Sequence, residues 1–243
     1  MKLEEYLKEI EKFLKKYLED SHLDGYVLGL SGGVDSTLVA AIAKNAVGKD
    51  KLWTYSLPIE SHKEDEEDAI KVAKHLDINL KVVDLTKTYR SFIDELKGDQ
   101  FLRLTKSNLK VRMRMCALYA YAQEHNALVL GTDNWDESYV GYFTKYGDGG
   151  VDVLPIVHLT KAEVRQAAKI YGFSDALADR VATAGLFEGQ TDEKELGFSY
   201  DTLDAYLLGK EIPVEAKNRI EHLHKISEHK RNPIPKMDRF SRE

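Results

Sequence analysis

The chain has 243 residues, of which 43% are hydrophobic and 31% charged, and its formal net charge is −6 with an isoelectric point near 5.8. These values are typical of a soluble globular protein, and the length allows one large α/β domain that buries a substantial core. The acidic balance argues against a general role in binding nucleic acids or membrane surfaces.

Cysteine content and the N-terminal segment narrow the class further. The single cysteine, Cys116, excludes an intramolecular disulfide framework and any multi-cysteine metal site. Because it lies in an apolar helical run, we expect it to be a buried structural thiol. The first residues read as a charged amphipathic helix from Leu3 to Leu18, not as a signal peptide, and no apolar run is long enough to cross a membrane. We therefore expect a cytoplasmic protein.

The stretch from Tyr26 to Ala43, YVLGLSGGVDSTLVAAIA, combines a strand, a glycine turn and a helix. Tyr26 to Leu30 is a short apolar run typical of a strand buried on both faces, and a helix is predicted from Ser36 onward. This arrangement directs backbone N–H groups and a helix dipole at an anion. A carboxylate repels phosphate unless a cation lies between them, so Asp35 indicates Mg²⁺ held against a polyphosphate. The turn lacks the Gly-Lys-[Ser/Thr] of a Walker A loop, and SGGVDS resembles the pyrophosphate loop of the N-type ATP pyrophosphatases.

Strands and helices then alternate. A second strand is predicted from Leu52 to the proline at 58, and Ser61 is a candidate cap for the acidic helix that follows. A third strand is predicted from Ile78 to Val83 and a helix from Thr86 to Leu96. This β-α-β-α-β order predicts an α/β fold with a doubly wound, Rossmann-like parallel sheet flanked by helices. No linker or repeat divides the chain, so we expect one domain over residues 1–243.

The next segments carry candidate ligand-binding residues. A helix is predicted from Asn108 to about Glu124. Arg112 and Arg114 lie on different faces of it, so at most one of them shares the face that Met115 and Leu118 bury, and spacing alone favours simple solvent exposure for a surface arginine. A fourth buried strand from Ala127 ends in Gly-Thr, at an edge where α/β sheets bind ligands. The acids of DNWDES that follow either complement a helix dipole or include a second Mg²⁺ ligand beside Asp35.

Two connections stand out after this strand. Tyr142 to Pro155 holds three aromatic residues, a lysine and three glycines, which is typical of a binding surface for a flat heterocycle, and Lys161 then begins a helix. Residues 183–197 have glycines and acids but few large apolar side chains. They are compatible with a solvated loop or with a mobile lid, and we expect disorder there without ligand. Short helices are predicted near Tyr200 to Leu208 and from about Val214 to Glu228, before a basic tail.

Several segments together resemble the ammonia-dependent NAD⁺ synthetases. They are SGGVDS, NLKVRMRM, GTDNWDES, GYFTKYGDGGVDVLP, LTKAEV, ATAGLFEGQTDEKELGFSYDTLD and EHKRNPIP, which follow the family's order from about residue 25 to 236. FTKYGDG and EGQTDEKELG are the most specific of these, whereas SGGVDS is shared with other pyrophosphatases. The departures, Ser107, Val111 and Val34, affect only local packing or a position that varies in the family.

The resemblance implies an enzyme, a ligase that forms a carbon–nitrogen bond in the final step of NAD biosynthesis. Deamido-NAD⁺, ATP and ammonia would give NAD⁺, AMP and pyrophosphate through an adenylated intermediate. The implied catalytic residues are Asp35, Lys161 and Thr183, and the implied metal ligands for Mg²⁺ are Asp35 and Glu137. The implied ATP-binding residues are Gly29, Leu30, Ser31, Gly32, Gly33, Val34, Asp35, Ser36, Thr37, Thr132, Lys161 and Thr183. The implied deamido-NAD⁺-binding residues are Arg112, Lys145, Asp152, His229 and Lys230.

Other functions remain to be distinguished. Another ATP pyrophosphatase, such as a GMP synthetase subunit or a tRNA-modifying thiolase, shares the loop, but the single cysteine and acidic charge disfavour the thiolase. A nucleotide-binding module without turnover is disfavoured by the presence of Asp35, Glu137 and Lys161. Only about two dozen residues precede the loop, so we expect ammonia to be used directly, whether or not a separate subunit supplies it. The family resemblance also implies a homodimer with a shared dinucleotide site.

Overall fold

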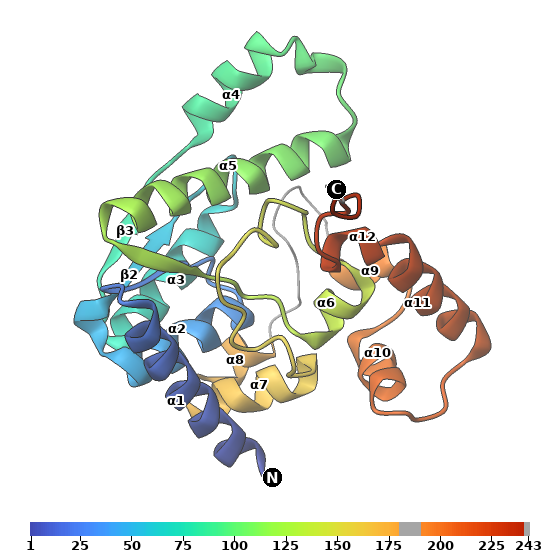
Figure 1. The fold of residues 1–243 in the computed structure, drawn as a ribbon, viewed down its shortest axis with the longest axis horizontal. Coiled ribbons are helices and arrows are strands. Elements are labelled where there is room, and N and C mark those ends of the chain that lie inside the picture. Colours follow the sequence, from blue (N-terminus) through green and yellow to red (C-terminus); the bar gives the residue numbers. More distant parts are fainter. Residues whose placement is uncertain (180–190, 241–243) are drawn as a thin grey trace.

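A parallel sheet lies at the centre of the computed structural model, which describes residues 1–179 and 191–240 (Figure 1). Its four strands, in the order β3-β2-β1-β4, are β1 (Gly25–Gly29), β2 (Leu52–Ser56), β3 (Leu80–Val82) and β4 (Ala127–Leu130). All pairings are parallel, and Tyr26 of β1 lies opposite Leu52 of β2 on one side and Leu128 of β4 on the other. The chain thus steps outward from β1 to β3 and returns to the far side of β1, which makes the β1/β4 boundary the switch point where such sheets bind ligands.

Helices cover both faces of this sheet. The longer ones are α1 (Leu3–Ser21), α2 (Val34–Val47), α3 (Lys63–Leu76), α4 (Thr86–Glu95), α5 (Arg103–Glu124), α7 (Lys161–Ile170), α10 (Tyr200–Leu207) and α11 (Val214–Ile226). The shorter ones are α6 (Trp135–Val140), α8 (Asp175–Ala178), α9 (Asp192–Leu196) and α12 (Glu228–Arg231). Because the first core cluster joins α1, α2, α3 and α7 to one sheet face and the second joins α5 to the other, the predicted doubly wound α/β architecture is confirmed.

The central helix α2 is buried around most of its circumference. Every residue from Ser36 to Ala43 is at most 3% exposed, because α1, α3 and α7 enclose the helix against the sheet. Alanines at three of these positions, Ala40, Ala41 and Ala43, allow the neighbouring helices to approach closely. The turn before α2 is therefore attached to one of the most rigid parts of the molecule.

A separate cluster of helices lies beyond the sheet, where Figure 1 shows α10 and α11 to the side of the main body. The buried side chains of α6, α9, α10 and α11 pack together around Leu203 and Ile220, both of which are fully buried. Helix α6 directly follows β4, so this cluster is attached to the same edge of the sheet as the switch point.

Four local expectations are wrong. Cys116 is exposed, because it lies on the face of α5 that points away from the sheet. The cap of α3 is His62, and Ser61 instead accepts a hydrogen bond from the backbone of Ile59. Helix α5 begins five residues earlier than Asn108, at Arg103. The third strand is also shorter than predicted, because only its central residues pair with β2.

The prediction of a loop or lid at residues 183–197 is assessed in two parts. Its first part, residues 183–190, lies outside the described residues. Its second part was assigned wrongly, since Asp192–Leu196 form α9. Acids in the first turn favour this helix, and Gly197 ends it at a φ of 87°. Leu196, which is 3% exposed, packs into the cluster formed by α6, α10 and α11. The helices predicted near Tyr200 and from Val214 are confirmed.

Candidate active site

The turn between β1 and α2 is ordered by its own serines. The Ser36 hydroxyl lies 3.0 Å from that of Ser31, accepts a hydrogen bond from the Ser31 N–H and donates one to the carbonyl of Gly33. Gly32 adopts a φ of 85°, and a Cβ there would meet backbone of α3 at 2.7 Å. The N–H groups of the first turn of α2 have no acceptor within the helix. The turn is thus a preformed cradle of donors at the carboxyl end of β1.

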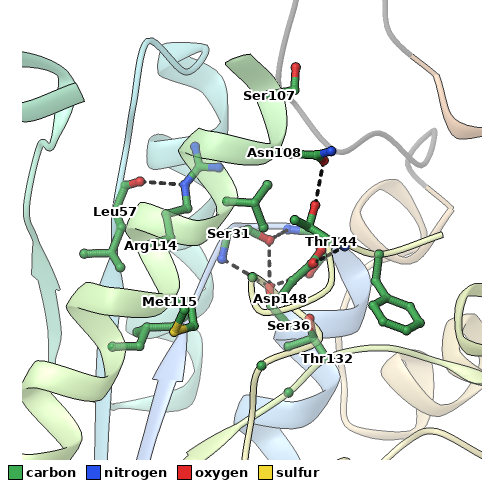
Figure 2. A pocket seen from close by; sticks show the side chains of 18 of the residues that line it. Ser31, Ser36, Leu57, Ser107, Asn108, Arg114, Met115, Thr132, Thr144 and Asp148 are labelled. Atoms are coloured by element: carbon green, nitrogen blue, oxygen red, sulfur yellow. Dashed lines mark hydrogen bonds between the residues drawn. The ribbon is translucent and has the colours of Figure 1, made fainter. Parts of the chain in front are cut away.

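A cavity of about 520 Å³ opens beside this turn, between the carboxyl edge of the sheet and α5 (Figure 2). It is lined by residues of the turn, of the β2 end, of α5 and of the connection after α6. The lining includes Gly29, Leu30, Ser31, Gly33, Ser36, Leu57, Asn108, Arg114, Met115, Leu118, Thr132, Tyr142, Thr144, Asp148, Glu195 and Lys230. This volume falls within the range of small-molecule sites.

A buried lysine joins two carboxylates next to the turn. The ammonium of Lys161, at the start of α7, lies 2.7 Å from Asp35 Oδ2 and 3.0 Å from Glu137 Oε1. The lysine side chain is 2% exposed, and those of Asp35 and Glu137 are 18% and 14% exposed. The structure therefore brings together three predicted residues from α2, α6 and α7.

Mutual charge and burial set the protonation of this group. Burial raises the pKa of Glu137 to about 7, with the Asp35 charge adding to the rise and Lys161 opposing it. Burial alone lowers the pKa of Lys161, but the two carboxylates outweigh burial and raise it above its ordinary value. Lys161 thus stays positively charged between the two carboxylates, and the net charge of this group depends on whether Glu137 is protonated.

Asn134 fixes the relative position of the two carboxylates. Its amide Nδ2 donates to Asp35 Oδ1 at 2.8 Å, while its Oδ1 accepts from the backbone N–H of Glu137 at 3.0 Å as the cap of α6. Asn134 is fully buried. The spacing Asn-x-x-Glu is a capping-box signature that is visible in the sequence, so this residue was recognisable before the structure was known.

Arg114 forms one wall of the cavity instead of facing solvent. Its guanidinium donates to the carbonyl of Leu57 at 2.9 Å and to Ser61 Oγ at 3.2 Å, which ties α5 to the end of β2 (Figure 2). Burial lowers the pKa of Arg114 to about 10, so it stays charged at neutral pH. The expectation of solvent exposure is wrong for Arg114. It holds for Arg112, which is exposed and donates to the carbonyl of Lys145 at 3.3 Å.

The connection after α6 forms another wall. Asp148 Oδ1 accepts the N–H of Thr144 at 2.6 Å, and the hydroxyl of Thr144 donates to Asn108 on α5 at 2.8 Å (Figure 2). Burial raises the pKa of Asp148 and of nearby Asp133 above their ordinary values, and the two carboxyl groups repel each other. Asp148, which lines the cavity, and Asp133 nearby are therefore more easily protonated than ordinary aspartates.

The C-terminal helix α12 is tied onto the same connection. The Lys230 ammonium donates to the carbonyls of Gly141 at 2.7 Å and Phe143 at 2.6 Å, and the Lys145 ammonium donates to the carbonyl of His229 at 2.5 Å. Burial lowers the pKa of Lys230, although Asp148 and Asp133 oppose the decrease. Two lysines expected to bind deamido-NAD⁺ therefore hold the chain together in the structure without ligand.

The remaining expected residues divide between the cavity and other places. Thr132 lines the cavity, whereas Val34 and Thr37 are buried in the core, and the Thr37 hydroxyl has no hydrogen-bond partner. Asp152 is exposed, accepts the N–H of Val129 at 2.8 Å and the hydroxyl of Tyr119 at 3.0 Å, and does not line the cavity. Thr183 lies outside the described residues.

The donor set is suited to a divalent cation that also binds a phosphate. Within residues 1–179 and 191–240, no three His, Cys, Asp or Glu side chains converge on one point. Asp35 and Glu137 do converge on the Lys161 ammonium, and two carboxylates with oxygens from a substrate are a typical Mg²⁺ shell. A divalent cation fits these residues when a polyphosphate completes its coordination.

Two tyrosines near the carboxylates were not predicted to contact the acids of this site. The hydroxyl of Tyr200 lies 3.2 Å from Glu137 Oε1 and 3.0 Å from Asp192 Oδ2, and its ring centroid lies 4.8 Å from the Lys161 ammonium. Tyr142 donates to Asp192 at 3.2 Å and to Glu195 at 2.6 Å. Tyr200 and Glu137 are 63 residues apart, so only the tertiary fold brings them together.

Comparison with known proteins agrees with this site. The family model described as NAD synthase matches residues 6–234. The NH(3)-dependent NAD(+) synthetase of Mesoplasma florum is 45% identical over all of both chains, and that of Alkaliphilus metalliredigens is 43% identical over 92% of this chain and 94% of its own. The solved NMN synthetase of Francisella tularensis is 34% identical, with a TM-score of 0.93 over 98% of this chain and 99% of its own. A Campylobacter jejuni NH3-dependent NAD synthetase, solved with nitrate, is 26% identical with a TM-score of 0.81 over 98% and 100%.

The fold and the site define an α/β enzyme that joins carbon to nitrogen, a ligase with a donor-rich turn at the switch point of a parallel sheet. The chain belongs to the NAD synthase family. None of the described helices has the length and apolar character needed to span a bilayer.

Proposed function

We propose that this chain amidates deamido-NAD⁺ to NAD⁺, using ATP and ammonia and releasing AMP and pyrophosphate. A nicotinate carboxylate oxygen attacks the α-phosphorus of ATP, and the bond from that phosphorus to pyrophosphate breaks. Ammonia then attacks the carbonyl carbon of the mixed anhydride, loses a proton and displaces AMP. The family supports amide formation, and the chain's own residues support the nucleotide chemistry.

The observation that carries the proposal is the Asp35–Lys161–Glu137 group beside the Ser31–Ser36 turn. A buried cation and a donor-rich turn at one edge are suited to neutralising the charge that develops on departing pyrophosphate. Because two carboxylates hold Lys161 beside the turn, a buried cation is already close to the edge where that charge appears. Asn134 keeps both carboxylates in register with the turn.

Asp35 and Glu137 would hold Mg²⁺ against the ATP phosphates. When bound there, the cation supplies charge neutralisation and orients the phosphates. Lys161 would then be released toward the phosphate oxygens, and the turn N–H groups would hold the β- and γ-phosphates. Ser31 and Ser36, whose hydroxyls lie 3.0 Å apart, would keep the turn in shape as the ligand arrives.

The acceptor would approach over the connection after α6. Arg112, Lys145, Asp152 and His229 do not line the cavity of the single chain, whereas Lys230 does. These residues lie near the surface formed by α5 and α12, which supports a homodimer that completes the dinucleotide site. Sedimentation at several concentrations tests that assembly: a chain that stays monomeric at all of them would rule it out.

An oxygen-transfer experiment tests the adenylated intermediate. Deamido-NAD⁺ labelled with ¹⁸O in the nicotinate carboxylate is incubated with ATP, Mg²⁺ and ammonium, and the products are analysed by mass. The proposal requires one labelled oxygen in AMP for each NAD⁺ formed, and Asp35→Asn abolishes both. Unlabelled AMP, or pyrophosphate release that ignores deamido-NAD⁺, would overturn it.

A second candidate acceptor is nicotinate mononucleotide, which would be amidated to NMN. Its support is the TM-score of 0.93 to the Francisella tularensis NMN synthetase, against 0.81 to the Campylobacter jejuni NAD synthetase. The curated relatives at 43–45% identity favour the dinucleotide. Competition between equal concentrations of the two acceptors, with both products followed by mass, gives the ratio of their kcat/KM values directly. A ratio in favour of the mononucleotide would replace the first assignment.

A further inference from the structure

We infer that Tyr200 is a positioning residue that fixes Glu137 for the divalent cation and connects it to α9; this inference rests on the proposed function. The observation is a buried hydroxyl that contacts two carboxylates at once. Tyr200 is 1% exposed, and its hydroxyl lies 3.2 Å from Glu137 Oε1 and 3.0 Å from Asp192 Oδ2.

The Tyr200 hydroxyl contacts the Glu137 oxygen that also takes part in the ion pair. Glu137 Oε1 is the same atom that accepts from the Lys161 ammonium at 3.0 Å. The other carboxylate oxygen is held by the backbone N–H of Asn134 at 3.5 Å. When Lys161 moves to phosphate, the Tyr200 hydroxyl is the remaining described donor to Oε1 that keeps the carboxylate facing the cation. Groups that orient metal ligands in this way change metal affinity by about 10- to 100-fold when removed.

The ring of Tyr200 adds a second constraint. Its centroid lies 4.8 Å from the Lys161 ammonium, so the ring face stabilises the cation that neutralises Glu137. The hydroxyl and the ring thus act on the two members of one ion pair. Replacing Tyr200 with phenylalanine separates these effects, because it keeps the ring and removes only the hydroxyl.

The hydroxyl also connects the cation site to α9. A phenol has one hydrogen to donate, whereas Glu137 and Asp192 both offer acceptor oxygens. The Tyr200 hydroxyl lies within hydrogen-bond distance of both, so a change at Glu137 on cation binding reaches Asp192, in the first turn of α9, through Tyr200. Tyr142 contacts Asp192 and Glu195 but does not contact Glu137 through any described hydrogen bond. Tyr200 is therefore a direct connection between the ion pair and this helix.

The test measures Mg²⁺ binding calorimetrically in the presence of α,β-methylene ATP, which prevents turnover at the α-phosphorus. We expect Tyr200→Phe to weaken Mg²⁺ binding by about 10-fold or more, with an unchanged KM for deamido-NAD⁺. Tyr142→Phe should keep the Mg²⁺ affinity of the wild type. The matched control is Tyr206→Phe on the same helix, whose hydroxyl pairs with that of Tyr139 at 3.4 Å, and it should change neither value.

A double-mutant cycle shows whether Tyr200 acts through Glu137. In a Glu137→Gln background, Tyr200→Phe should cause no further loss of Mg²⁺ affinity. Hydrogen exchange of the α9 amides should slow on Mg²⁺–analogue binding in the wild type but not in Tyr200→Phe. Additive losses in the cycle, or a Tyr200→Phe chain with wild-type Mg²⁺ affinity, would overturn the inference.

The Mg²⁺-binding and amidation measurements also distinguish a failure of this inference from a failure of the proposed function. A wild-type chain that binds Mg²⁺ with the analogue but amidates neither nicotinate acceptor refutes the proposed function, and the cycle still decides the role of Tyr200. A wild-type chain that binds no Mg²⁺ with the analogue refutes the inference, whichever acceptor it uses.

Discussion

Replacing Lys161 with methionine removes the cation between Asp35 and Glu137 while keeping most of the side-chain volume. Each carboxylate oxygen lies within 3.0 Å of the lysine ammonium, at 2.7 and 3.0 Å. The two oxygens are therefore less than about 6 Å apart, and at an effective dielectric constant of about 20 two unit charges at that distance repel by about 3 kcal/mol. Breaking a buried ion pair costs about 3–5 kcal/mol in all, so we expect a loss of that size in the free energy of unfolding at pH 8.

The loss should depend on pH through Glu137. Its pKa is raised to about 7, so its contribution to stability is complete below its ordinary pKa and is lost as the pH rises through about 7. Without Lys161 that pKa rises further, and more stability is lost above pH 7, by up to about 1.4 kcal/mol per pH unit. Millimolar Mg²⁺ should restore part of it by supplying the missing charge.

Urea unfolding at pH 5.5, 7.0 and 8.5, with and without Mg²⁺, measures these effects. The matched control is Lys169→Met on the same helix, because Lys169 is 40% exposed and pairs with the surface residues Asp175 and Asp179. Exposed pairs contribute about 0–1 kcal/mol. A Lys161→Met loss that is no larger than that of the control, or that is equal at pH 5.5 and 8.5, would refute the electrostatic account of the site.

Two further predictions concern the walls of the site. Arg114→Met removes a charged donor from the Leu57 carbonyl and should lower the free energy of unfolding by about 2–3 kcal/mol. The control Arg112→Met, two residues away and exposed, should change this free energy by no more than about 0.5 kcal/mol. Similar losses for the two variants in urea unfolding would contradict the assignment of Arg114. Gly32→Ala and Gly48→Ala both place a side chain at positive φ, at 85° and 84°, which costs about 1–3 kcal/mol. Only Gly32→Ala forces a Cβ against backbone, at 2.7 Å, so this variant should have the lower melting temperature in thermal unfolding. Equal melting temperatures for the two variants would show that the turn accommodates the Cβ with no loss of stability.

The β1–turn–α2 unit was predictable because its information is local. An unbroken apolar run, two glycines and a helical pattern follow one another within eighteen residues, from Tyr26 to Ala43. The parallel pairing of the strands also followed from the alternation of elements, since parallel strands require crossover connections. The family resemblance then supplied Asp35, Glu137 and Lys161, and the structure places these three in contact.

Residues whose role depends on which face of a helix is covered were not predictable in the same way. Arg114 and Cys116 lie two apart on α5. The Arg114 side chain is half-buried and donates to the carbonyl of Leu57, whereas Cys116 is exposed. Periodicity alone does not give the rotation of a helix when apolar residues surround it. The short helix α9 was missed because its stability comes from Leu196 in the core, and propensity contributes little in five residues.

The order of the strands explains why the three charges of the candidate site meet where they do. Asp35 follows β1 and Glu137 follows β4, and these strands are neighbours only because the chain crosses back over β1 after building β2 and β3. Lys161 then enters from α7, which packs against α2 on the same face of the sheet as that helix. A slip in the β1/β4 register by one residue would move the two carboxylates by about 3.3 Å relative to each other, beyond the reach of a single ammonium or metal ion. The buried pairing of β1 with β4 therefore positions the candidate site as much as the side chains that follow these strands do.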